Sequence, residues 1–140
     1  MKEIAFEKEL TVLSKRENVD EVSMFVSSYL YEKGAEKRLI SKVNLVIDEI
    51  YANISQYGYK DTLGDVVVKV GFVDDVFYLA FVDKAPMFNP LERDDPDITL
   101  SADERGIGGL GIFIVKNTMD ELDYRYVNNE NHLTLAKKIK

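Results

Sequence analysis

The amino-acid sequence predicts one α+β domain built as a two-layer sandwich of helices on a β-sheet. Apolar residues alternate with others over 66–72, two aspartates follow, and an apolar run returns over 76–82, which predicts a β-hairpin. Two stretches, 20–33 and 35–56, carry apolar side chains at helical spacing. Strands paired through hairpins, with helices gathered apart from them, are typical of this architecture. The length of 140 residues suits a single domain spanning 1–140.

Local signals place the remaining elements. Asn18 or Asp20 can cap the start of the first helix, and Gly34 and Gly58 stand where the two helices are expected to stop. Between 83 and 105 the periodicity gives way to prolines and charges, which predicts a lid, a binding loop or a disordered segment. The complete order is a strand at 3–12, the two helices, the hairpin, the loop, a helix that opens at 106–111, and strands at 122–127 and 132–139 joined by a turn at 128–131.

Composition narrows the class of function. A formal net charge of −7, with scattered lysine and arginine, argues against nucleic-acid binding, because phosphate backbones need a clustered basic surface. The chain has no cysteine and only one histidine, His132, which removes disulfides, thiolate metal sites and multi-histidine zinc sites. It has no apolar run long enough to span a membrane and no apolar leader after Met1, so a cytoplasmic protein is expected.

Glu49 and Asn53 form the first candidate site. They lie four residues apart and share one edge of the apolar stripe of their helix, beside Val46. A carboxylate at the edge of a core can take a proton from an attacking hydroxyl or water, and an amide oxygen can ligate Mg²⁺. For this spacing alone, two solvated polar side chains are the commoner explanation.

Asp83 is the second candidate, at the end of a predicted strand. Its carboxylate can accept a hydrogen bond from an exocyclic amine such as that of adenine. An aspartate followed by a proline also marks an ordinary turn, which explains this position equally well when it is taken alone.

Four glycines, Gly106, Gly108, Gly109 and Gly111, precede the third helix. Glycines let backbone amides approach phosphate oxygens at a helix N-terminus, so a phosphate-binding loop is expected, with a flexible helix start as the alternative. The letters also match the dinucleotide fingerprint G-x-G-x-x-G. That fingerprint should follow a buried strand, whereas charged residues precede it here.

These three motifs occur in an order that resembles the GHKL (Bergerat-fold, histidine-kinase-like) ATPases. Residues 43–54 resemble the helical N-box, the Asp83 segment resembles the adenine-binding box, and the glycine run resembles the phosphate-binding box with its lid hinge. The patterns at 83–90, 105–111 and 131–135 are similar to the anti-sigma-factor serine/threonine kinases in particular. The resemblance covers nearly the whole chain and implies a mixed, mostly antiparallel sheet covered on one face by helices.

The resemblance implies a role for each matching residue. Asn53 would be the Mg²⁺ ligand, Glu49 the general base, and Asp83 the acceptor for the adenine amine. Thr134, on the last strand, matches a position that assists adenine recognition. Ala85 stands where the family usually has glycine, so its methyl group is expected to crowd the adenine or strain the turn. The expected phosphate and lid residues are Arg105, Gly106, Gly108, Gly109, Leu110 and Gly111.

The resemblance also implies an ATP-dependent protein serine/threonine kinase that uses ATP and Mg²⁺. Its substrate would be an anti-anti-sigma protein, its sequestered partner a sigma factor, and a homodimer is a further expectation. Three alternatives remain: an ATP-gated protein-binding module without kinase turnover, the ATP-binding domain of a sensor histidine kinase, and a structural domain that binds no nucleotide.

Overall fold

The computed structural model describes residues 4–60, 62–92 and 109–139, and for 109 and 110 it describes the backbone alone. The strands are β1 (Lys8–Leu13), β2 (Asp65–Val73), β3 (Val76–Asp83), β4 (Glu121–Val127) and β5 (Glu130–Lys138). The helices are α1 (Val19–Glu32), α2 (Lys37–Asn53) and α4 (Gly109–Thr118), with short helical turns η1 (Arg16–Asn18), η2 (Ile54–Gly58) and η3 (Pro90–Glu92).

The five strands form one sheet in the order β1-β2-β3-β5-β4, and each neighbouring pair is antiparallel. The predicted mostly antiparallel sheet is therefore confirmed, and the described strands form no parallel pair. Two of the four pairings are tight hairpins that turn on Asp74–Asp75 and Asn128–Asn129, whose φ angles lie between 51° and 64°. Two central residues with positive φ match the right-handed twist of antiparallel strands.

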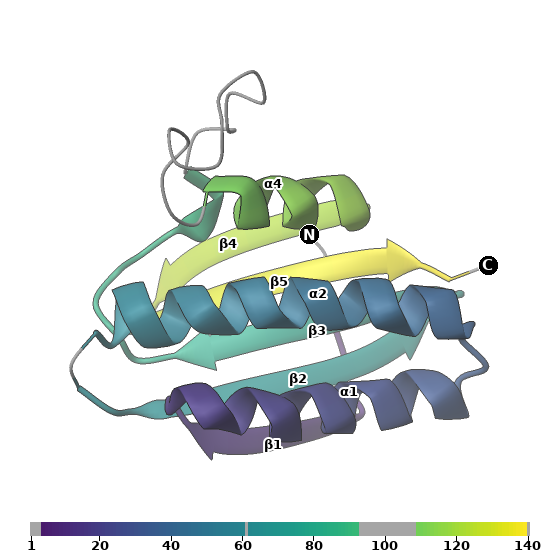
Figure 1. Cartoon of the computed structure of the whole chain (residues 1–140), viewed down its shortest axis with the longest axis horizontal. Coiled ribbons are helices and arrows are strands. Elements are labelled where there is room, and N and C mark those ends of the chain that lie inside the picture. Colours follow the sequence, from purple (N-terminus) through teal and green to yellow (C-terminus); the bar gives the residue numbers. More distant parts are fainter. Residues whose placement is uncertain (1–3, 61, 93–108, 140) are drawn as a thin grey trace.

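The helices α1, α2 and α4 lie in one layer over a single face of the sheet (Figure 1). The α2 helix supplies the middle of the core because its apolar stripe has no exposed surface. This stripe consists of Val43, Val46, Ile47 and Ile50, and it faces the buried side chains of β2 and β3, namely Val66, Val68, Val70, Leu79 and Phe81. The two-layer prediction is confirmed. The core holds α2 over the sheet, beside the strands that carry the candidate site.

The predicted helix limits are close to those observed, with local differences. Asn18 stands before α1, but its side-chain amide donates to the carbonyl oxygen of Leu13 at 2.9 Å and does not cap the helix. Gly34 follows α1 with a φ of 82°, as a helix-stopping glycine does. After Asn53 the α2 helix continues as the π-helical turn η2, which ends at Gly58.

Two strand limits differ from the prediction. The first strand begins at Lys8 because residues 4–7 run across the sheet surface at Gly71, where an added Cβ atom would lie 3.3 Å from the Ala5 oxygen and from the Phe6 Cα atom. The last strand begins at Glu130, two residues early, because the hairpin turn takes only two residues. The extension brings Asn131 into the sheet beside Asp83.

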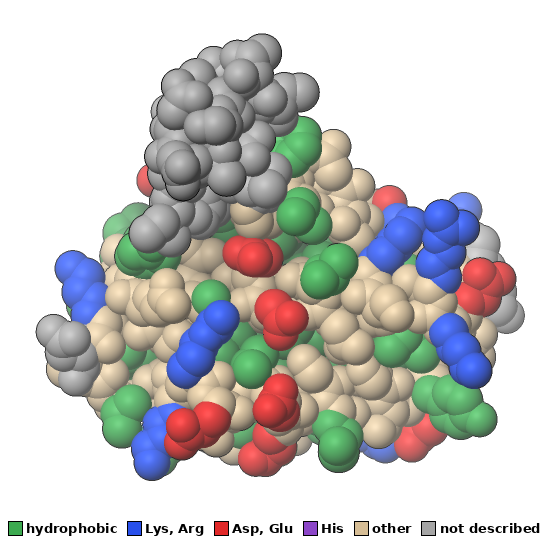
Figure 2. Space-filling model, viewed as in Figure 1, with side chains coloured by type: hydrophobic (Ala, Val, Ile, Leu, Met, Phe, Trp, Pro, Cys, Tyr) green, Lys and Arg blue, Asp and Glu red, His purple; other side chains and the backbone are tan. Residues whose placement is uncertain are grey.

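Figure 2 shows the helix-covered face, with acidic side chains at its centre and lysine and arginine toward its edges. Asp20 and Glu21 of α1 and Asp48 of α2 are among the exposed acidic residues. On the described part of this face there is no continuous basic stripe of the kind that nucleic-acid binding needs. None of the described helices is long and apolar enough to cross a membrane.

Candidate functional site

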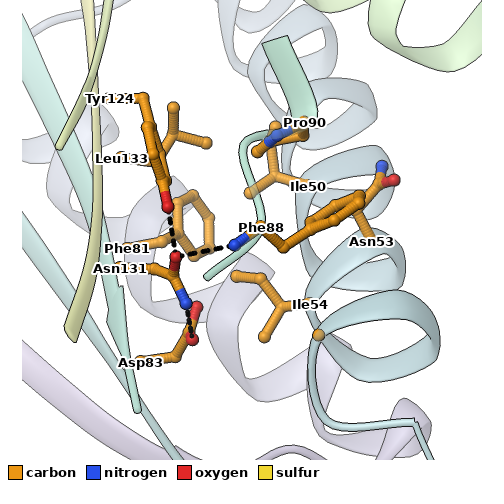
Figure 3. Close-up of a pocket in the computed structure, with 11 residues that line it drawn as sticks. Ile50, Asn53, Ile54, Phe81, Asp83, Phe88, Pro90, Tyr124, Asn131 and Leu133 are labelled. Carbon is orange, nitrogen blue, oxygen red and sulfur yellow. Dashed lines mark hydrogen bonds between the residues drawn. The ribbon is translucent and has the colours of Figure 1, made fainter. Parts of the chain in front are cut away.

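A small pocket lies between α2 and the sheet (Figure 3). Most of its wall is apolar, and a few polar side chains converge on it, which is the usual composition of a small-molecule site. It is lined by Ile50 and Asn53 of α2, Ile54 and Gly58 of η2, Phe81 and Asp83 of β3, Phe88 and Pro90 of the following segment, Tyr124 of β4, and Asn131 and Leu133 of β5. The lining therefore combines apolar walls with one polar edge at Asp83 and Asn131.

Asp83 is the charged side chain among these lining residues, and it is 6% exposed. Its Oδ1 atom accepts hydrogen bonds from the Ala85 backbone N–H at 3.0 Å and from the Asn131 side-chain amide at 2.9 Å. Burial raises the pKa of the Asp83 carboxyl group, and these two hydrogen bonds oppose that rise. The backbone N–H of Lys84 also donates to the Tyr59 hydroxyl at 2.9 Å, so the chain leaving β3 is held firmly.

Asn53 and Glu49 lie on the α2 side. Asn53 is 3% exposed and lines the pocket, and its side-chain nitrogen donates to the Glu49 carbonyl oxygen at 2.7 Å. Glu49 is half-buried and its carboxylate lies against Gly111 in the first turn of α4. Figure 3 shows Asn53 and Asp83 on opposite sides of the pocket, with Phe88 between them. The Phe88 ring stacks on Tyr57, with 6.1 Å between ring centroids.

A substitution at Gly111 can test the position of the Glu49 carboxylate. A Cβ atom at position 111 would lie 1.8 Å from the Glu49 Oε2 atom, and a carboxylate at the end of a flexible side chain can rotate away. Gly111→Ala is therefore expected to keep the fold, and it gains helix propensity of about 1 kcal/mol. If Glu49 is the general base that the sequence predicts, displacing its carboxylate should lower the reaction rate by about 10- to 100-fold. Thermal unfolding measures stability and ADP release measures the rate, and an unchanged rate would contradict that role.

Ala85 is buried beside the pocket. It is 2% exposed, is absent from the pocket lining, and has an ordinary negative φ. Its methyl group packs beside Gly58, where an added Cβ atom would lie 3.3 Å from the Ala85 Cβ. The expectation that this methyl group strains the turn is therefore wrong, and the crowding of a bound base stays a prediction.

Ala85→Gly is expected to leave ATP affinity unchanged while it lowers stability by about 1–2 kcal/mol. The methyl group packs in the core, and glycine adds freedom to the unfolded chain. Calorimetric titration with ATP and thermal unfolding separate the two effects. A large gain in ATP affinity in the variant would show that the methyl group does restrict the pocket.

Thr134 lies on the wrong face of the sheet for its predicted role. It pairs with Ala80 and Asp123, and its side chain lines a hollow on the face opposite the helices, with Lys69 and Arg125. Its strand neighbours at odd positions, Asn131 and Leu133, face the pocket instead. Arg105, Gly106 and Gly108 lie outside the described residues, and Gly109 and Leu110 are seen only as backbone in α4.

The described lining contains no lysine, arginine or histidine that could neutralise phosphate groups. No cluster of three metal-binding side chains is present among the described residues either. Magnesium does not need such a cluster, because it is commonly held by one or two protein oxygens together with substrate phosphates. The amide oxygen of Asn53, in the pocket wall, fits this mode of binding.

Residues 12–137 match the family of the histidine kinase-like ATPase domain, and the chain belongs to this family. The chain is also 25% identical over 138 residues to "Serine-protein kinase RsbW" of Bacillus cereus, covering 95% of this chain and 85% of that protein.

Solved structures share the fold. The RsbU and RsbW domains of Rv1364c from Mycobacterium tuberculosis superpose with a TM-score of 0.63 at 17% identity, covering 95% of this chain and 33% of that one. The SiaB–SiaC complex from Pseudomonas aeruginosa gives a TM-score of 0.52 at 16% identity, covering 91% of this chain and 88% of that one. The α+β architecture is therefore that of histidine kinase-like ATPase domains.

Proposed function

We propose that this protein is an ATP-dependent protein serine/threonine kinase of the anti-sigma-factor type. The observation that carries the proposal is the pocket between α2 and the sheet, with the buried Asp83 on one wall and Asn53 on the other. The similarity to proteins named serine-protein kinase RsbW supports the type of reaction. Its substrate would be a serine or threonine of an anti-anti-sigma protein, and a sigma factor would be the partner that it sequesters.

The residues divide the work by position. Asp83 binds the amine edge of adenine, and the apolar walls from Ile50, Phe81 and Leu133 hold its ring. Asn53 would hold Mg²⁺, and the bound ion would supply charge that neutralises the phosphates. Glu49 orients the incoming hydroxyl and takes its proton. The backbone N–H groups at the start of α4 complete the phosphate site.

The first test is calorimetric titration of the full chain with ATP, with and without Mg²⁺, beside Asn53→Ala. We expect binding that depends on Mg²⁺ in the natural protein and loses that dependence in the variant. Transfer of the terminal phosphate of ATP is then measured with anti-anti-sigma proteins of the source organism. Absence of ATP binding in all conditions would overturn the proposal. Binding without transfer to any of them would favour an ATP-gated protein-binding module.

A further inference from the structure

Asn131 is a buried polar residue of the pocket that belongs to none of the three motifs. It is 5% exposed, lies on β5 directly opposite Asp83 of β3, and lines the pocket. Figure 3 shows its side chain at the meeting point of Asp83, Tyr124 and Phe88. A buried amide with this many neighbours has a defined orientation, and that orientation determines which group it presents to Asp83.

The backbone around Asn131 fixes which end of its amide is oxygen. The Phe88 backbone N–H, which can only donate, bonds to Oδ1 at 3.1 Å. The carbonyl oxygens of Ala85 and Pro86, which can only accept, lie 3.1 and 3.2 Å from Nδ2. The Tyr124 hydroxyl also donates to Oδ1. A flipped amide would break the three bonds to the backbone, so Asn131 must present an N–H group to Asp83.

Burial raises the pKa of Asp83, and this N–H group opposes that rise. Asn131 Nδ2 and the Ala85 backbone both donate to Asp83 Oδ1, and two donors on one oxygen favour an ionised carboxylate. No described residue donates to the second oxygen, Oδ2. His132 and Glu130, the neighbours of Asn131 on β5, act on the Asp83 pKa in opposite directions. Ionised Asp83 therefore offers Oδ2 as an acceptor.

An acceptor at this position discriminates between purines. The 6-amino group of adenine donates a hydrogen bond to it, whereas a 6-oxo group would bring a second acceptor against a carboxylate. We propose that Asn131 is a positioning residue that sets base selectivity: it holds Asp83 ionised and oriented, so that the pocket accepts 6-amino purines and refuses 6-oxo purines. This inference rests on the proposed ATP binding and adds the residue that enforces the choice of base.

The test compares ATP, inosine triphosphate and purine riboside triphosphate, which carry an amino group, an oxo group and a hydrogen at position 6. Calorimetric affinities are measured for the natural full-length chain and for Asn131→Leu. We expect the natural protein to prefer ATP over inosine triphosphate by about 10- to 100-fold, as for a hydrogen bond to a charged group. In Asn131→Leu this preference should fall by about tenfold.

A merely structural role for Asn131 would weaken all three nucleotides equally, and an unchanged ratio of affinities in Asn131→Leu would overturn the inference. If Asn131→Leu does not fold, Asn131→Ser removes the amide with a smaller side chain and replaces it in the comparison. Thr134→Val, on the same strand and the opposite face, is the control and should keep the preference.

The two proposals fail in different ways. If the natural protein binds no ATP, the proposed function itself is wrong. If it binds and prefers ATP while Asn131→Leu keeps the same ratio of affinities, only the role of Asn131 is wrong.

Discussion

Glu49→Gln is expected to reduce phosphoryl transfer by about 10²- to 10⁴-fold while ATP binding stays nearly unchanged. Glutamine keeps the shape of the side chain but cannot take a proton from the attacking hydroxyl. Glu49 is outside the pocket lining and lies beside Gly111, so it is not placed to contact the adenine ring of ATP. Phosphorylation of an anti-anti-sigma protein and calorimetric ATP affinity measure the two quantities separately.

Asp48→Asn is the matched control for this prediction. Asp48 is the preceding residue of α2 and is exposed, so the same chemical change at this position should leave transfer intact. If Glu49→Gln transfers phosphate at the natural rate, Glu49 is not the general base, even if ATP binding is confirmed. A loss of ATP binding in Glu49→Gln would instead assign Glu49 to nucleotide retention.

The α2 helix shows why part of the site could be predicted from the sequence. Its apolar period determines which face is buried, and Glu49 and Asn53 follow at one edge of that face. The structure finds Asn53 buried in the pocket, Glu49 half-buried and Asp48 exposed. Local periodicity predicts the burial of these three side chains because a single rigid helix fixes the direction in which each one points. The chemical roles of these residues stay predictions.

The β5 strand shows why the rest could not be predicted. Its start was placed two residues late, and Asn131 was therefore assigned to a turn. The partner of Asn131 is Asp83, 48 residues earlier in the chain, and no local pattern reports such a pairing. Side chains alternate between the two faces of a strand, so assigning the adenine contact to Thr134 placed it on the wrong face.

Ala85 shows the same limit in a different form. Its methyl group fits in the core because Gly58, at the end of η2, leaves room for it. The space at one position was therefore created by a residue on another element. Comparing Ala85 alone with the family pattern does not reveal that Gly58 compensates for it. The packing of Ala85 against Gly58 in the structure does.

Asp83→Asn is expected to lower ATP affinity by about 100-fold and to reverse the preference for the purine edge. The two N–H groups that donate to Oδ1 will hold the amide oxygen of the new side chain in the same place. The amide nitrogen must then occupy the position of Oδ2, so a donor replaces the acceptor. It opposes the 6-amino group of ATP and bonds to the 6-oxo group of inosine triphosphate.

The pH dependence of the natural protein provides a second measurement of the same carboxylate. Burial raises the pKa of Asp83 above the ordinary 3.8, so its proton is held at less acidic pH than in the unfolded chain. The bond to the adenine amine needs the ionised form, so ATP affinity should be full above the raised pKa and should fall as pH drops through it. The amide of Asp83→Asn cannot take up this proton, so the fall of ATP affinity at low pH (the acid limb) should be absent in the variant.

Stability should move in the opposite direction from affinity. Because the folded-state pKa is raised, keeping Asp83 ionised at neutral pH opposes folding, and a neutral amide removes that opposition. Asp83→Asn should therefore unfold at the same temperature as the natural protein or higher, while its ATP binding is weak. A variant that loses ATP binding only because it is unfolded would contradict this argument, and so would one that keeps both ATP affinity and its acid limb. Intact folding, weak ATP binding and improved binding of the 6-oxo nucleotide in Asp83→Asn are together expected only if the Asp83 carboxylate recognises the 6-amino group of adenine.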